Sequence, residues 1–323
     1  MINLPTKTAL VMGAVFALSQ PLLAASCCGG GSSSALIMPK FAKGMVDVSF
    51  SAENYDGYWN SAGQYIEDPA GSDLKQYRLN VGYAHRLGER WQGSVITPHV
   101  WNDNQYSGVS SATQGMGDTT LNLWYEGFDN IKCVWKIKKP EDWIPASYYG
   151  LSMTLPTGIS PYDDVQNSFD ITGRGFYRLD ANLLLDKTIY PWNATLALSY
   201  GKYLERPVNR EYGRYVEPYD KQLGDRFSGS ISGGYTQFLD NMDTLTYTLA
   251  YAYLQEEQGT INGAVDTTTG MNKQSLSTTI AYASMDRDWV FKLTLSHTPT
   301  QDGYGESFPV TNLITAGVSH VLR

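Results

Sequence analysis

The sequence predicts an all-β protein, a transmembrane antiparallel up-and-down β-barrel of about 12 strands that follows a cleaved signal peptide. From residue 46 to the C-terminus, apolar residues recur at every second position, which is the period of a strand whose two faces meet different surroundings. Short and long connections alternate between these segments. No later segment reaches the roughly 20 consecutive apolar residues that a membrane-spanning helix needs.

The N-terminus has the pattern of a secretory signal peptide. Lys7 precedes an apolar run over residues 9–18, and small residues follow shortly before Cys27. We therefore assign residues 1–26 to a signal peptide, which predicts export. Lipoprotein cleavage with acylation of Cys27 is the alternative, although Ala24 stands where that signal usually carries leucine.

The rest of the chain divides into a short tail and one large domain. Residues 27–44 begin with glycines and serines, which predicts a flexible periplasmic N-terminal segment. Residues 45–323 contain all the alternating segments and form the predicted outer-membrane β-barrel.

Each predicted strand places apolar residues on one face and polar residues on the other. In the first strand, the apolar residues at positions 46, 48, 50 and 52 alternate with polar ones, and the segment between Trp91 and Trp101 is the weakest example. The predicted strands cover residues 46–53, 76–83, 91–101, 120–126, 149–155, 177–185, 194–200, 227–235, 245–253, 276–282, 289–295 and 314–318.

The links between these strands alternate in length, which favours a membrane barrel over a soluble β-sandwich. The short links are residues 87–90, 186–191, 239–242 and 285–288, and the long polar links are residues 56–73, 102–114, 157–172, 205–223, 255–271 and 299–311. Outer-membrane barrels have short periplasmic turns and long external loops. Lipid requires the apolar faces outward, and a closed sheet leaves no unpaired strand edge.

Two short motifs resemble a known family. GMGD at residues 115–118 lies directly before a predicted strand, and LPTG at residues 155–158 closes the next one. These motifs resemble the signatures of the transporter family named for the meta-pathway of phenol degradation. The resemblance implies an outer-membrane barrel and a link to the handling of aromatic compounds.

The inward faces of the predicted strands carry charged side chains, mainly in the first half of the barrel, whereas later strands contribute mostly serine and threonine. One interpretation is a pore whose transverse field selects small polar or amphipathic solutes. The other is that arginines and carboxylates pair across a narrow barrel and close it. The predicted lumen and selectivity residues are Asp47, Glu53, Arg78, Arg86, Glu126, Arg174, Arg178, Asp180 and Lys292.

All three cysteines fall on the periplasmic side of the predicted barrel. Cys27 and Cys28 precede the first strand, and Cys133 lies in the link over residues 127–147. A disulfide between Cys133 and one of the adjacent cysteines is one hypothesis, which leaves the third thiol free or joined to a partner. A soft metal such as Cu(I) on three thiols is another, and an incidental structural role is the third.

The same link carries a cluster of lysines that is typical of a docking surface rather than of a minimal turn. A periplasmic redox or metal-handling protein is the partner that these lysines and the cysteines together would suit. The predicted docking lysines are Lys132, Lys136, Lys138 and Lys139.

The sequence carries no enzyme signature and predicts no cofactor. It contains no GxSxG, HExxH or CxxCH motif. The histidines are scattered near strand ends, where they do not form a catalytic group with a serine and an acid. The net charge of −8 argues against a nucleic-acid partner, because phosphates are bound by a concentrated basic face.

The sequence therefore predicts a porin-like channel or transporter in the outer membrane, in contact with membrane lipids and passing small solutes, among them aromatic or amphipathic ones. The alternative function is a barrel scaffold that docks a periplasmic redox or metal-handling partner through its cysteines and basic turn.

Overall fold

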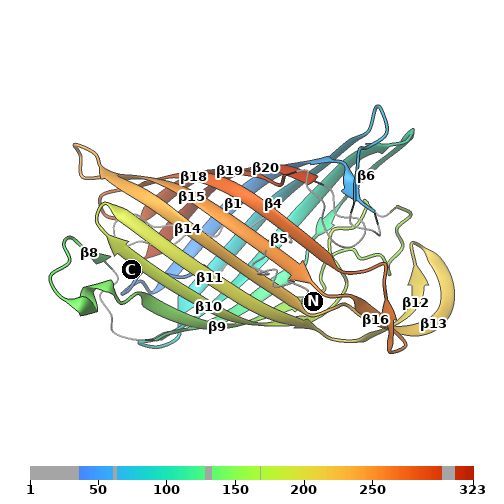
Figure 1. Ribbon diagram of the computed structural model, residues 1–323, viewed down its shortest axis with the longest axis horizontal. Coiled ribbons are helices and arrows are strands. Elements are labelled where there is room, and N and C mark those ends of the chain that lie inside the picture. The colour runs from blue at the N-terminus through green and yellow to red at the C-terminus, as the bar shows by residue number, and fades with distance from the viewer. Residues whose placement is uncertain (1–35, 61–63, 128–132, 168, 300–309) are drawn as a thin grey trace, which may run out of the picture.

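The fold is a closed antiparallel β-barrel (Figure 1). The computed structural model describes residues 36–60, 64–127, 133–167, 169–299 and 310–323. The main sheet has 14 strands, of which β6 and β8 are accessory and the other twelve form the wall. The wall strands are β1 (Gly44–Asp56), β4 (Asp73–Arg86), β5 (Trp91–Tyr106), β7 (Thr119–Glu126), β9 (Ala146–Leu155), β10 (Arg178–Ile189), β11 (Trp192–Tyr203), β14 (Arg226–Phe238), β15 (Thr244–Glu256), β18 (Met271–Ala283), β19 (Trp289–His297) and β20 (Val310–Leu322).

Closure comes from the pairing of the first and last strands, β1 and β20, from Gly44 opposite Leu322 to Asp56 opposite Val310. Every other wall strand pairs antiparallel with its neighbours in the chain. The predicted all-β barrel of about 12 strands is confirmed, and each predicted segment overlaps one wall strand. The predicted signal peptide lies outside the described residues.

Several long links, predicted as polar loops, contain strands. In β6 (Val109–Met116) the chain folds back on β5. The other strands of this kind are β2 (Tyr58–Trp59), β3 (Tyr65–Ile66), β12 (Arg206–Glu211), β13 (Arg214–Gln222), β16 (Gly259–Ile261) and β17 (Ala264–Asp266). Three of these hairpins turn at Ser107 and Gly108, Tyr212 and Gly213, and Asn262 and Gly263, where both residues have positive φ. Two-residue hairpin turns of this type favour glycine at the second position.

The two faces of the wall follow the predicted alternation. Apolar side chains such as Leu151, Ile231 and Leu249 point outward and are at least 60% exposed, as expected for a surface covered by lipid. Aromatic pairs lie near the short turns, where Trp91 contacts Tyr125. Within the described ranges, no helix has the length and apolar character to cross a membrane.

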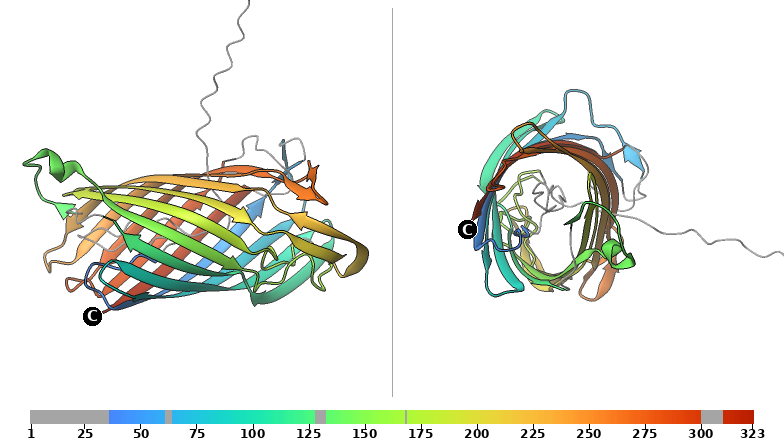
Figure 2. Two further views of the ribbon diagram at one scale, coloured as in Figure 1. Left: turned by 90° about the horizontal axis from the view of Figure 1, so that it is seen from below. Right: turned by 90° about the vertical axis from the view of Figure 1, so that its left-hand side faces the viewer.

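A short N-terminal segment, residues 36–42, lies inside the barrel, and we call it the plug. Leu36 and Met38 are buried among inward residues of the wall, and Ile37 belongs to a second cluster with Trp124. The Met38 N–H donates to Gln92 Oε1 over 2.8 Å. The sequence predicts a flexible periplasmic tail over residues 27–44, whereas residues 36–42 occupy the end of the lumen where short turns join the strands. End-on, chain segments are visible inside the barrel (Figure 2).

A buried ion pair joins β1 and β19, on the side of the barrel opposite β10. The Lys292 ammonium group lies 2.9 Å from Oδ2 of Asp47, and the Ser319 hydroxyl donates to the same oxygen over 2.5 Å. All three residues are less than a tenth exposed. Breaking such a pair leaves a buried charge without its counter-charge, which costs more than removing both charges.

The first prediction concerns this pair. Lys292→Met leaves the Asp47 carboxylate buried without the ammonium group, so we expect the free energy of unfolding to fall by about 3 kcal/mol. Urea unfolding of the purified barrel in lipid vesicles, followed by tryptophan fluorescence, measures the change. The double variant Asp47→Asn with Lys292→Met should recover part of the loss, whereas Lys202→Met, at an exposed outward position, serves as the control. Equal stability of the two single variants would contradict the prediction.

Candidate functional site

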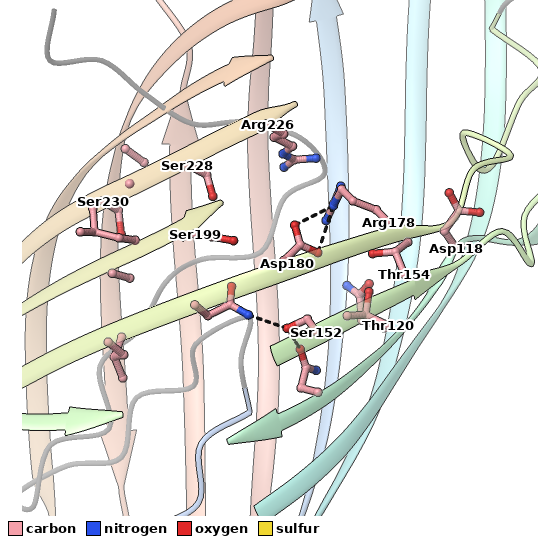
Figure 3. A pocket seen from close by; sticks show the side chains of 18 of the residues that line it. Asp118, Thr120, Ser152, Thr154, Arg178, Asp180, Ser199, Arg226, Ser228 and Ser230 are labelled. Carbon is pink, nitrogen blue, oxygen red and sulfur yellow. Dashed lines mark hydrogen bonds and ion pairs between the residues drawn. The ribbon is translucent and has the colours of Figure 1, made fainter. Parts of the chain in front are cut away.

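A cavity of about 240 Å³ lies inside the barrel, and we call it the chamber (Figure 3). Its lining comes from inward residues of β4, β5, β7, β9, β10, β11, β14, β15, β18, β19 and β20, so the chamber crosses the full width of the lumen. Several lining residues, among them Arg178 and Arg226, stand at the first positions of their strands. The chamber is therefore nearer to the end where long links join the strands, which we call the long-loop end.

The register of β10, β11, β14 and β15 aligns four inward residues side by side on one wall of the chamber. Asp180 lies opposite Gly201, and Gly201 lies opposite Arg226. Arg226 in turn lies opposite Glu256. A Cβ at position 201 would overlap the Asp180 carboxylate, so the glycine gives this carboxylate its space in the row.

Charged side chains gather at the long-loop end of the chamber, and we call three of them the arginine cluster: Arg174, Arg178 and Arg226. Arg174 binds both carboxylate oxygens of Glu256, with N–O distances of 2.5 and 2.7 Å. Arg178 Nε lies 2.8 Å from Oδ1 of Asp180. Figure 3 shows Arg178, Asp180 and Arg226 directed toward the same part of the chamber. Paired, bidentate contacts of this kind stabilise buried guanidinium groups.

Tyr203 joins these ion pairs. Its hydroxyl accepts hydrogen bonds from Arg174 over 2.6 Å and from Arg178 over 3.2 Å, and it donates to Glu256 over 3.2 Å. Both guanidinium carbons also lie over the Tyr203 ring, 5.3 and 5.4 Å from its centroid. The tyrosine therefore holds both arginines by its hydroxyl and by cation–π attraction.

The link between β9 and β10, residues 156–177, is anchored to Asp118. The Asp118 carboxylate accepts hydrogen bonds from two backbone N–H groups, that of Arg174 over 2.8 Å and that of Gly158 over 3.1 Å. A Cβ at Gly173 would overlap this carboxylate. Burial raises the pKa of the Asp118 carboxyl group above its usual value, and the two N–H groups oppose that rise. Asp118 thus fixes the backbone from which Arg174 reaches into the chamber.

The two motifs behind the family resemblance meet at this anchor. The Thr157 hydroxyl, from LPTG, donates to the Gly117 carbonyl oxygen, in GMGD, over 2.6 Å. The Thr172 hydroxyl donates to the Met116 carbonyl oxygen, also over 2.6 Å. Both motifs therefore attach the β9–β10 link to the barrel wall.

An apolar group forms the other end of the chamber, which we call the floor. Trp124, Leu184 and Ala197 line the chamber there and contact Ile37 of the plug through one buried cluster. The Trp124 ring lies over Gly150, where a Cβ would come within 2.7 Å of it. The chamber thus has charged groups toward the long loops and apolar groups toward the plug.

The predicted lumen residues fall into separate places. Arg78, Arg174, Arg178 and Asp180 line the chamber. Asp47 and Lys292 form the ion pair described above, and Glu53 accepts a hydrogen bond from Tyr55. Arg86 donates to two plug carbonyl oxygens, those of Pro39 and Ala42, and Glu126 lies 3.8 Å from Lys40 of the plug.

Two features differ from the sequence interpretation. The sequence predicts Arg174 on a strand, whereas it lies in the β9–β10 link and enters the chamber because Asp118 holds its backbone N–H. The sequence also predicts inward charges mainly in the first half, whereas the later strands contribute Arg226 and Glu256 besides Lys292. Arg226 shares the inward parity of Ser228 on β14, and Glu256 shares that of Ala252 on β15, so the alternation itself contained the signal that would have identified them.

The chain between β7 and β9 forms an arm at the short-turn end, described over residues 133–145. It contains β8 (Cys133–Val134), which pairs parallel with the end of β10, and the 3₁₀ helix η1 (Pro140–Trp143). The Lys187 ammonium group donates to the Ile144 carbonyl oxygen over 3.0 Å. The Asp142 carboxylate accepts hydrogen bonds from the backbone N–H groups of Lys138 and Lys139. These bonds lower the pKa of the Asp142 carboxyl group. The arm is thereby folded against the rim.

The predicted docking residues lie on this arm. Lys136, Lys138 and Lys139 are exposed, and Lys132 lies outside the described residues. Cys133 is disulfide-bonded, while Cys27 and Cys28 lie outside the described residues. Among the side chains that the structure describes, no group of three or more His, Cys, Asp or Glu could hold a metal ion.

Comparison with solved structures identifies the fold as that of outer-membrane barrels. An outer-membrane channel from Pseudomonas putida F1 matches with a TM-score of 0.66 and 12% sequence identity, over 88% of this chain and 97% of that chain. The β-domain of the Bordetella autotransporter BrkA matches with a TM-score of 0.50 and 12% identity, over 87% of this chain and 100% of that domain. No protein-family model and no curated protein matches the sequence. The predicted outer-membrane location is confirmed by this fold.

The second prediction concerns the anchor. Gly173→Ala brings a methyl group against the Asp118 carboxylate, and we expect the overlap to cost about 1–3 kcal/mol and to release the β9–β10 link. Trypsin cleavage after Arg174, quantified by mass spectrometry on the folded barrel, should become faster than in the unmodified protein. The matched control is Gly88→Ala, because a Cβ at Gly88 meets no heavy atom within 4 Å. Equal cleavage rates in both variants would show that Asp118 does not hold the link.

Proposed function

We propose that this protein is a porin-like channel that passes small amphipathic or aromatic solutes across the outer membrane by diffusion, without a catalytic step. The observation that carries the proposal is the chamber, which crosses the lumen between the long loops and the plug. The similarity to the Pseudomonas putida channel supports the same function through the fold. Selection in such a channel follows from width and from the charges that line it.

The two ends of the chamber suit a solute with a polar and an apolar part. A solute that enters from the long-loop end first meets the arginine cluster and the Ser228 and Ser230 hydroxyls. It then meets the floor, where Trp124 and Leu184 offer apolar contact. Pockets that orient small ligands combine a mostly apolar lining with a few placed polar groups in this way.

Passage beyond the floor requires the plug to move. The plug is held by the burial of Leu36, Ile37 and Met38 and by hydrogen bonds from Arg86 to two of its carbonyl oxygens, each over 3.0 Å. These are contacts within the lumen, so the plug can leave without opening the strand pairs of the wall. We infer that displacement of the plug opens the route to the periplasm.

The third prediction tests the channel and its plug together. The purified protein in planar lipid bilayers should show discrete conductance steps, and Ile37→Ser should raise the fraction of time spent open. Losing the burial of one isoleucine side chain weakens the closed state by about 2 kcal/mol, which corresponds to roughly a thirtyfold change in the open-to-closed ratio.

Phe41→Ser is the matched control, because Phe41 belongs to the same segment but is 87% exposed. Its open fraction should equal that of the unmodified protein. A folded barrel without any conductance would refute the channel, whereas equal effects of both variants would refute the role of the plug.

A second candidate function is a dock for a periplasmic protein on the arm. The observation that favours it is the exposure of Trp143 and Ile144, which are 61% and 44% exposed, beside the positive charges of Lys138 and Lys139. Exposed aromatic residues with a basic surround are common at protein interfaces. Such a dock would suit an acidic redox partner, whereas Cys133 offers no thiolate to a metal-handling protein because it is disulfide-bonded.

The fourth prediction tests this dock in cells. A photo-reactive amino acid at position 143 should cross-link to one periplasmic protein, and replacing Lys136, Lys138 and Lys139 by glutamine should reduce the yield roughly tenfold, as for the loss of several charge contacts. Lys75→Gln, at the opposite end of the barrel, is the control. Cross-links to phospholipid alone would instead assign the arm to the membrane surface and refute the dock.

A further inference from the structure

We propose that the chamber binds small aromatic carboxylates, with the carboxylate group at the arginine cluster and the ring toward the floor. The proposal rests on the channel function given above and names the class of solute. Four observations carry it: the excess of guanidinium groups in the lining, their arrangement on facing walls, the small residues beside them, and the apolar floor.

Guanidinium groups outnumber carboxylates around the chamber. Four arginines line it against two aspartates, Asp118 and Asp180. When Glu256 is added, which binds Arg174 from β15, the count is still four against three. The side chains of Arg78 and Arg226 are 5% and 8% exposed. An excess positive charge with so little access to water favours an anionic guest, because charges interact more strongly there than in bulk water.

The arginines reach the chamber from facing walls. Arg78 belongs to β4 and Arg226 to β14, which are six places apart in the ring of twelve wall strands. Arg178 belongs to β10, which is two strands from β14 in the wall, with β11 between them. Guanidinium groups therefore enter the lining of the chamber from opposite sides of the barrel. Arginine suits carboxylates in particular, since its planar fork can donate two parallel hydrogen bonds.

Small side chains next to Arg226 leave room for such a group. Ser228 and Ser230 follow it on the inward face of β14, and Ser199 lies opposite Ser228 on β11. Figure 3 shows these serines along the same side of the chamber. Each hydroxyl can donate to a carboxylate oxygen, so the wall offers neutral donors beside the charged ones.

The apolar part of the lining favours a solute with an aromatic ring. Trp124 lines the chamber at the floor, and aromatic rings favour offset or edge-to-face contact with another ring. The volume of about 240 Å³ is below the range of roughly 300–1,000 Å³ typical of pockets for drug-sized ligands. A single ring with one carboxylate therefore fits the chamber better than a long acyl chain or a polycyclic solute does.

The fifth prediction is tested by binding and by conductance. Isothermal titration of the intact barrel in detergent should detect benzoate, whereas benzyl alcohol, of similar shape but neutral, should bind roughly tenfold or more weakly, as for the loss of a charge-assisted hydrogen bond. Acetate, which has the carboxylate but no ring, should also bind more weakly than benzoate. In planar bilayers, benzoate should reduce single-channel current at concentrations that leave it unchanged with benzyl alcohol.

Matched variants locate the site. Arg226→Gln should weaken benzoate binding roughly tenfold, and Arg226→Lys should recover part of it, because the positive charge returns without the planar fork. Lys202→Gln is the control, since Lys202 follows Gly201 on β11 but points outward and its side chain is 62% exposed. If Arg226→Gln does not fold, the comparison of benzoate, benzyl alcohol and acetate on the unmodified protein still decides the proposal.

Each outcome separates the proposal from the channel function. Preference for benzoate that falls in Arg226→Gln but not in Lys202→Gln supports the site. Equal affinity for benzoate and benzyl alcohol, or for benzoate and acetate, overturns it. Ion conductance without any benzoate binding also overturns the proposal and leaves the channel standing, whereas benzoate binding without conductance keeps the site and refutes the channel.

Discussion

The structure depends on the closure of one sheet, in which β1 pairs with β20 from end to end. Lipid supplies no hydrogen-bond partners, so the backbone groups between the two rims have to pair within the protein. Closure also fixes the register, because a shift of one residue between two strands would turn an apolar face toward the lumen and a polar face toward lipid. The placement of every inward side chain follows from this register, including the row from Asp180 to Glu256.

The lumen that closure creates is filled from both ends by the protein's own chain. The plug covers the floor at the short-turn end, and the β9–β10 link enters from the long-loop end, where Asp118 holds its backbone N–H groups. These segments differ in how they are held. The link is fixed by hydrogen bonds and by close glycine contacts, whereas the plug rests chiefly on apolar burial with a few hydrogen bonds from the wall. The β9–β10 link, at the charged end of the lumen, is therefore held more rigidly than the plug.

The fold could be predicted from the sequence because lipid selects apolar residues at every second position, and that selection acts on all twelve wall strands. Hairpins beyond the membrane escaped prediction, since water contacts both of their faces and no alternation marks them; only turn residues such as Asn262 and Gly263 signal them. In the site, parity predicts an inward direction for Arg178 and Asp180, and both side chains line the chamber. The position of Arg174 could not be predicted, because it is set by a contact with Asp118, 56 residues away in the chain.

Stability alone does not explain why the chamber is lined with charges. Desolvation of two buried ions often offsets their attraction, so well-packed apolar side chains can replace a buried ion pair at little cost or with a gain. The wall already contains buried apolar inward residues, such as Ile96 beside the plug and Val100 beside Gly117, which shows that the lumen accommodates them. Tyr203 and the glycine at position 201 nevertheless create a place where guanidinium and carboxylate groups fit together. Groups kept in this arrangement around a cavity are better explained by what the cavity holds than by the strength of the barrel.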